Sequence, residues 1–173
     1  DKPIVERQAA NLVRKLALAL QVAHQKGIVH RDLKPDNIMI DQEQGEPVIT
    51  DFGLARMTSA DDLHLTISGQ IMGTPAYMPP EQARGDLQQI GPASDIYSLG
   101  VIFYELLCGK RPFKSPSVAE VLSDILVKQP QSPSVHRPSI DRQLEAICVK
   151  AMAKKIEDRY KSMAELAAAL SKY

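Results

Sequence analysis

The chain has little cysteine, no tryptophan and no excess of charge of either sign. Its two cysteines, Cys108 and Cys148, lie in apolar, helix-like stretches, which argues against a disulfide framework or a cysteine-based metal site and favours a reducing compartment. Lys plus Arg and Asp plus Glu both number 21, so the formal net charge is zero. Such a chain lacks the broad positive field that attracts nucleic acid or an anionic membrane, although a local basic patch stays open. We therefore expect no nucleic-acid partner.

Long hydrophobic runs are also missing. No apolar stretch approaches the roughly 20 residues of a membrane-spanning helix, and no signal-peptide pattern is recognisable. Hydrophobic residues still make up 44% of the 173 residues, which is enough for one domain with a buried core. Because the chain opens with Asp1 directly ahead of a helical pattern, we expect it to be part of something longer.

The spacing of apolar residues predicts a mainly helical fold. A helical repeat covers 6–26, and Gly27 supplies its stop. Further helices are predicted at 94–109 with Ser94 as the cap, from Ser117, at about 141–154, and from Ser162. Two short β-like runs, 38–40 and 48–50, predict a small hairpin. The stretch 51–93 has no sustained period, and a loop of that length is uncommon unless it is functional.

Two short motifs carry the residues best suited to chemistry. Residues 30–37 read HRDLKPDN, and residues 51–53 read DFG. Two acids and an amide on loops beside a hairpin could hold hard cations, which prefer oxygen ligands. Phosphoryl transfer needs such metals, a carboxylate that orients the attacking hydroxyl, and a cation near the transferred group. Either motif alone is commonly an ordinary turn or surface pair, but the two together are specific.

With these motifs the sequence resembles the eukaryotic-like (Hanks-type) serine/threonine protein kinases, and its phrasing is closest to the bacterial branch. Residues 30–37 resemble the catalytic loop, 51–53 the metal-binding motif, 73–81 the substrate-positioning loop, 94–100 the start of the central helix, and 158–160 the closing arginine motif. The resemblance implies that 1–173 is a kinase C-terminal lobe. Its fold would be a helical bundle with a small β-hairpin beside the catalytic loop, and 51–81 would be the activation segment.

The same resemblance implies roles for individual residues. Asp32 would accept or orient the proton of the substrate hydroxyl, and Lys34 would lie near the transferring phosphoryl group. Thr74 would bridge these two side chains, a feature of serine/threonine-specific members. The residues expected to bind ATP and Mg²⁺ are Asn37 and Asp51 as metal ligands and Met39 as the floor of the adenine pocket.

A second group of residues is expected to support the site. Glu81 resembles one partner of a buried ion pair, and Arg159 resembles the other. Asp95 would accept hydrogen bonds from the backbone of the catalytic loop, or would act as a simple helix N-terminal acid, and both can hold. His30 and Phe52 are expected to be structural residues.

Regulation is predicted on the activation segment. In relatives with this arrangement, Arg31 and Arg56 receive a phosphate, and Thr66 and Ser68 lie where bacterial relatives are phosphorylated. A phosphate there would gain charge-assisted hydrogen bonds to the arginine pair and order the loop. For either hydroxyl alone, an ordinary polar loop residue is an equally good interpretation.

The resemblance fails ahead of residue 28, where nothing matches the glycine-rich loop, the strand lysine or its helix glutamate partner. We therefore expect the isolated chain to be inactive and to need the other lobe, the N-lobe, for full ATP binding. A surface around Met39, Phe52 and His30 would be exposed, which could drive self-association. The expected location is cytoplasmic, where ATP and Mg²⁺ are available, and is compatible with a membrane anchor outside this segment.

Two alternatives to an active serine/threonine kinase acting on protein substrates stay open. One is a pseudokinase or docking module that binds protein partners without phosphotransfer. Intact Asp32, Lys34, Asn37 and Asp51 favour the active enzyme over it. The other is a helical adaptor unrelated to kinases, which leaves the long loop and both motifs unexplained.

Overall fold

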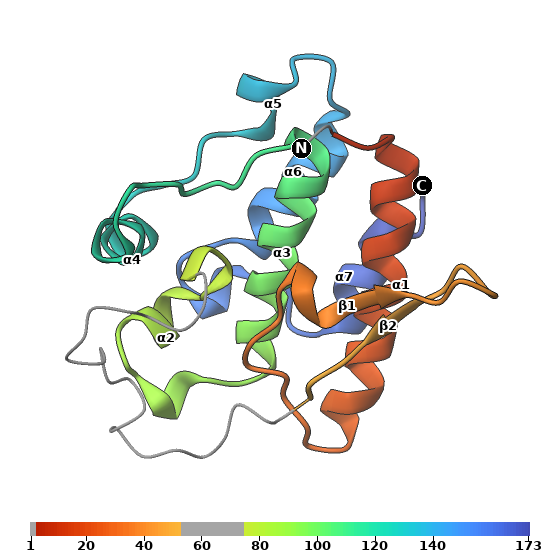
Figure 1. Cartoon of the computed structure of the whole chain (residues 1–173), viewed down its shortest axis with the longest axis horizontal. Coiled ribbons are helices and arrows are strands. Elements are labelled where there is room, and N and C mark those ends of the chain that lie inside the picture. The colour runs from red at the N-terminus through yellow and green to blue at the C-terminus, as the bar shows by residue number, and fades with distance from the viewer. Residues whose placement is uncertain (1–2, 53–74) are drawn as a thin grey trace.

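The helix α3 (Pro92–Cys108) runs through the middle of the molecule, and α1 (Glu6–Gln25) packs beside it (Figure 1). This computed structural model describes residues 3–52 and 75–173. Two further helices complete the core: α6 (Arg142–Ala151) packs on α3, and α7 (Met163–Leu170) packs on both α1 and α6. The other described helices are α2 (Pro80–Ala83), α4 (Val118–Val127) and α5 (Pro133–His136). The predicted mainly helical fold is confirmed.

Helix α3 is buried along most of its length, including the polar residues Ser94, Asp95 and Ser98. A helix covered on all sides belongs to the interior of a domain, so its polar groups need partners within the protein. At Gly100 the backbone approaches α6 so closely that an added Cβ would lie 2.9 Å from Cβ of Ala151. The helix ends at Gly109, whose φ of 67° is the left-handed conformation that terminates many helices.

The predicted hairpin is confirmed, with its second strand beginning one residue earlier than expected. Strand β1 (Ile38–Ile40) pairs antiparallel with β2 (Pro47–Ile49), and Ile38 lies opposite Ile49. The hairpin crosses α1 (Figure 1), and Ile49 joins the hydrophobic core beneath it. An ion pair of 2.5 Å between Lys15 of α1 and Glu46 ties the strand connection to the same helix. The hairpin, which separates the two motifs in the chain, is therefore held against α1.

Helix boundaries were predicted well where a local cap sets them. Ser117 and Ser162 accept hydrogen bonds from the amides of Glu120 and Glu165, as the capping pattern predicted. The prediction that Ser94 caps α3 was wrong, because the helix begins at Pro92 with Gly91 as its N-cap. The predicted helix at about 141–154 ends already at Ala151, and the short helix α5 was not predicted.

The sequence has little cysteine and no long hydrophobic runs, and the described residues bear on both features. Both cysteines are buried free thiols. Of the helices described, none has the length and apolarity that a membrane crossing requires.

Candidate active site

The loop that carries the first motif leaves the end of α1 and returns to the hairpin. Gly27, with φ 75°, reverses the chain direction, and the 3-10 turn Pro35–Asn37 leads into β1. On this loop Nζ of Lys34 lies 2.6 Å from Oδ2 of Asp32, and the Asp32 side chain is 49% exposed. A solvent-exposed pair of this kind contributes at most about 1 kcal/mol to stability. It does place a carboxylate and an ammonium group together where a substrate can reach them.

Asn37 and Asp51 are brought together by the hairpin. The backbone amide of Thr50 donates to the carbonyl of Asn37 at 2.9 Å, which continues the strand pairing by one residue and leaves Asp51 just beyond it. Asn37 is buried, and its Nδ2 donates to the backbone carbonyl of Asp32 at 2.8 Å. Asp51 is exposed and accepts a hydrogen bond of 3.2 Å from the Thr50 hydroxyl. Asn37 thus connects the two motifs, because its side chain bonds to Asp32 while its backbone carbonyl accepts the amide hydrogen of Thr50, the residue before Asp51.

The donor set of these two side chains fits Mg²⁺. Nδ2 of Asn37 is already committed to Asp32, so its Oδ1 and the Asp51 carboxylate are the oxygen donors on offer. Among residues 3–52 and 75–173 no three His, Cys, Asp or Glu side chains gather into a metal cage. Mg²⁺ commonly binds through one or two carboxylates plus substrate phosphates, and a dedicated all-protein cage is not its usual site. The pair therefore suits a metal that arrives with a nucleotide.

Both motifs contain a backbone in an unfavourable conformation. Arg31 has φ 69° and Asp51 has φ 59°, and no other non-glycine residue in the described part of the chain has a positive φ. For an L-amino acid the left-handed region costs about 1–2 kcal/mol. Such conformations persist where the surrounding structure imposes them, and they cluster at functional sites.

Asp95, in the first turn of α3, imposes the conformation at Arg31. Its Oδ2 accepts the amide hydrogen of His30 at 2.8 Å, and its Oδ1 accepts that of Arg31 at 2.9 Å. The carboxylate is 1% exposed, so these bonds form away from competing water. The role expected for Asp95 on the backbone of this loop corresponds to these two contacts.

A third donor reaches Asp95 that sequence reasoning missed. Nε2 of His24 lies 2.8 Å from Oδ2 of Asp95. A signal for it was present, because His24 continues the buried stripe of Val13, Leu16 and Leu20 on α1. A polar side chain on a buried stripe needs a hydrogen-bond partner, but the sequence does not say which one.

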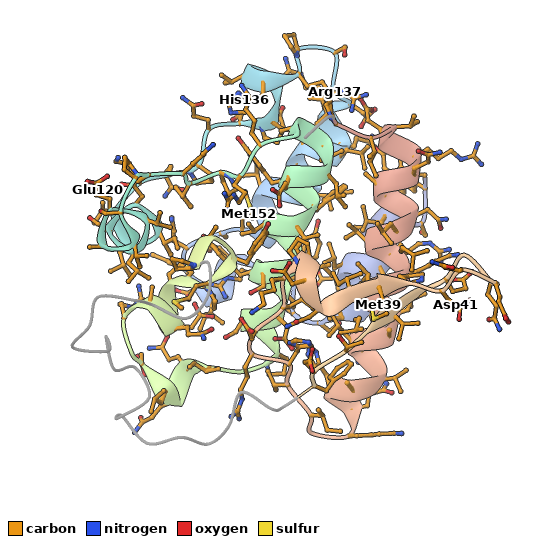
Figure 2. The ribbon with its side chains drawn as sticks, viewed as in Figure 1. Met39, Asp41, Glu120, His136, Arg137 and Met152 are labelled. Atoms are coloured by element: carbon orange, nitrogen blue, oxygen red, sulfur yellow. The ribbon has the colours of Figure 1, made fainter. Side chains whose placement is uncertain are left out.

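His30 is buried and not exposed, which corrects the expectation for the surface around it. Its ring centroid lies 5.1 Å from that of Phe52, which is half-buried, and its Nε2 is 2.9 Å from the carbonyl of Thr50. Since a carbonyl only accepts, Nε2 donates, and Nδ1 accepts the amide hydrogen of Asp32 at 3.3 Å. Figure 2 labels Met39, which lies on β1. It is 60% exposed, as a residue that meets a ligand or another lobe would be.

Glu81 and Arg159 form the expected buried ion pair. Burial by itself would raise the pKa of the Glu81 carboxyl, but the hydrogen bonds and charge of Arg159 outweigh it and hold the pKa below the ordinary value of 4.5. Ser94 adds a hydrogen bond of 2.8 Å to the same carboxylate. The pair joins α2, which follows residues 53–74, to the segment ahead of α7.

Four predicted site residues lie outside the described residues: Thr74, Arg56, Thr66 and Ser68. The remaining regulatory residue, Arg31, is described. Its Nε is buried and has no hydrogen-bond partner among the residues that the structure covers. Asn37 and Asp51 lie at the open end of the hairpin, whereas Glu81 and Arg159 join α2 to the segment ahead of α7.

A helical lobe that holds these two loops beside a hairpin defines a protein kinase catalytic lobe. The protein kinase domain model matches residues 1–169, and the chain belongs to this family. It is 41% identical over 170 residues to the serine/threonine-protein kinase PknB of Mycobacterium leprae, an alignment that covers 98% of this chain and 27% of that protein. The serine/threonine-protein kinase Pkn1 of Myxococcus xanthus is 40% identical over 171 residues, covering 97% of this chain and 24% of that protein.

Solved structures show the same fold. The crystal structure of the Mycobacterium tuberculosis PknI kinase domain matches with a TM-score of 0.73 and 26% identity, covering 99% of this chain and 57% of that one. Rad53 residues 1–466 in complex with AMP-PNP matches with a TM-score of 0.74 and 25% identity, covering 98% and 40%. The chain thus spans about a quarter of the length of the curated relatives it matches.

Proposed function

We propose that the protein containing this chain transfers the γ-phosphate of ATP to serine or threonine hydroxyls of other proteins. The observation that carries this proposal is the contact of 2.6 Å between Lys34 and the accessible carboxylate of Asp32, on a loop held from beneath by Asp95. Relatives named as serine/threonine-protein kinases support the same reaction class.

The chemistry asked of these residues is mostly positioning. Asp32 orients the substrate hydroxyl and accepts its proton as the oxygen attacks the phosphorus. Lys34 places a positive charge beside the transferring group and stabilises the negative charge on it. Asn37 and Asp51 would hold Mg²⁺, which when bound neutralises charge on the nucleotide phosphates. The hydrogen bond from Asn37 to the carbonyl of Asp32 fixes the position of the metal ligand Asn37 relative to the base Asp32.

Binding of ATP uses more than these 173 residues. Exposed Met39 would contact the adenine from below, and the roof of the pocket and the phosphate clamp would come from the N-lobe. We therefore propose that the isolated chain transfers phosphate poorly, because the parts of a catalytic site act as a unit. The reaction would take place in the cytoplasm, which supplies ATP and Mg²⁺.

We also propose that phosphorylation of the stretch 51–81 regulates the enzyme. The Nε of Arg31 has no hydrogen-bond partner in the described residues, and a phosphate on Thr66 or Ser68 would bind the guanidinium of Arg31 together with that of Arg56. Mass spectrometry of the autophosphorylated protein tests this. Phosphate on either residue is the expected result, and its absence from the whole stretch would contradict the proposal.

The main test is transfer of labelled phosphate by the complete kinase domain, meaning this chain with its N-lobe. We expect label on serine or threonine, and its loss in Asp32→Asn. Asp36→Asn is the matched control, because it makes the same change on the same loop without touching the Asp32 and Lys34 pair. A folded wild-type domain that transfers nothing with Mg²⁺ present would instead favour a docking pseudokinase.

A further inference from the structure

We propose that His24 is a positioning residue for Asp32 and acts through Asp95. This inference rests on the proposed function and adds to it a residue on α1 that lies outside both motifs. Nε2 of His24 and Oδ2 of Asp95 are 2.8 Å apart although 71 residues separate them in the chain. Their side chains are only 6% and 1% exposed, so the contact is formed in the interior.

The chemistry of the pair assigns the proton. A carboxylate offers acceptors only, so His24 donates through Nε2 and its ring orientation is set by that bond. Oδ2 of Asp95 then receives two donors, His24 and the amide of His30, while Oδ1 receives the amide of Arg31. Three donors compensate a buried carboxylate for the water it has lost. Without His24, Asp95 would retain only its two bonds to the loop.

Those two bonds hold a strained backbone. Arg31, with φ 69°, is the residue directly before Asp32. Any rotation of the Asp95 carboxylate would release one of the two amides, and the chain would relax toward a more favourable φ. Because Asp32 follows at once, its carboxylate would change direction. The third donor, His24, opposes that rotation through its bond to Oδ2.

His24 also lies in the last turn of the helix from which the loop departs. Its carbonyl accepts the amide hydrogen of Gly27 at 3.0 Å, so the backbone of His24 sets the exit of the chain from α1. Its side chain meanwhile contacts the start of α3. His24 thus contacts both Gly27, where the loop begins, and Asp95, which binds the backbone in the middle of the loop.

The test compares His24→Gln with His24→Asn in the complete kinase domain. The terminal nitrogen of Gln is as many bonds away from Cβ as Nε2 of His is. Gln can therefore still donate to Asp95. Asn is one carbon shorter and cannot. We expect kcat to fall about tenfold or more in His24→Asn, with KM for ATP and peptide within about twofold, and to recover largely in His24→Gln. His24→Leu is a second variant without a donor, should His24→Asn fail to fold.

Two further measurements separate positioning from general stability and from the reaction itself. Ile147→Val removes a methylene in α6 away from the loop and should lower Tm without lowering kcat. Amide hydrogen exchange of peptides covering 28–34 should quicken in His24→Asn but not in Ile147→Val or His24→Gln. The exchange result stands even if the wild-type domain transfers no phosphate, which would refute only the proposed function. Equal kcat and equal exchange in the Gln and Asn variants would overturn the role of His24.

Discussion

The guanidinium of Arg159 binds both carboxylate oxygens of Glu81, each at 2.8 Å, and neither side chain is exposed. Arg159 further donates to the backbone carbonyls of Ala93, Ala153 and Lys154. A buried pair satisfied in this way joins three segments far apart in the sequence. Removing one partner leaves a charge in the interior without compensation.

We therefore predict that Arg159→Met lowers the free energy of unfolding by about 3–5 kcal/mol, because Glu81 loses its counter-charge. Urea denaturation of the kinase domain measures this. The control pair is Arg142 and Glu145, where the arginine side chain is 77% exposed, and Arg142→Met should cost at most about 1 kcal/mol. Similar losses in both variants would show that the buried pair is not the stronger contact.

Gly100→Ala should destabilise the protein even though alanine is the better helix former. Alanine gains about 1 kcal/mol in a helix interior. Its Cβ would, however, lie 2.9 Å from both Cβ of Ala151 and Cγ of Met152, and 3.2 Å from a backbone carbon of Ala151. Overpacking against backbone costs about 1–3 kcal/mol, so the clash should dominate.

Thermal unfolding checks this prediction, with Gly91→Ser as the control. An added Cβ at Gly91 meets nothing within 4 Å, and serine is a preferred N-cap. We expect Tm to fall for Gly100→Ala and to stay level or rise for Gly91→Ser. A rise in Tm for Gly100→Ala would mean that α6 moves aside easily.

Lys154 should make stability depend on pH under alkaline conditions. Burial, with a smaller effect from the charge of Arg159, lowers its pKa from 10.5 to about 8. Its ammonium donates to the carbonyl of Ile125 and lies 4.3 Å from the ring centroid of Phe113, contacts that favour the charged form but do not offset burial. Between pH 8 and pH 10.5 the unfolded chain would hold a proton that the folded chain has lost.

The sign follows from that difference in bound protons. Where the unfolded state binds more protons, the free energy of unfolding rises with pH. Relative to Lys154→Met, the wild type should therefore gain stability from pH 8 to pH 10.5 and level off above. Urea denaturation of both proteins over this range measures the difference, in which the titration of other groups cancels. A flat difference would contradict the lowered pKa.

Asp51→Asn should separate folding from chemistry. Asparagine adopts positive φ about as readily as aspartate, so the free energy of unfolding should change by less than about 1 kcal/mol. Loss of the carboxylate should reduce phosphate transfer about a hundredfold or more, and raise the Mg²⁺ concentration needed for what remains. Labelled transfer across a Mg²⁺ titration measures both. Unchanged transfer would remove Asp51 from the metal site.

Much of the fold was decided by short stretches of sequence. The end of α1 at Gly27, the caps at Ser117 and Ser162 and the hairpin all depend on interactions within a few residues, which is why spacing and capping patterns predicted them. The kinase family could be identified from the two motifs for the same reason. Their residue types and spacing are specific even before the chain is folded.

Tertiary structure alone decided the rest. Ser94 lies inside the first turn of α3, and not at its cap, because Glu81 takes its hydroxyl hydrogen and the amide of Gly91 donates to the same oxygen. His30 is buried because the ring of Phe52 packs on it, and His24 meets Asp95 across 71 residues. A local pattern can show that a polar residue will be buried and will need a partner. Only the packing of α1 against α3 supplies that partner, since contacts between distant segments leave no trace in periodicity.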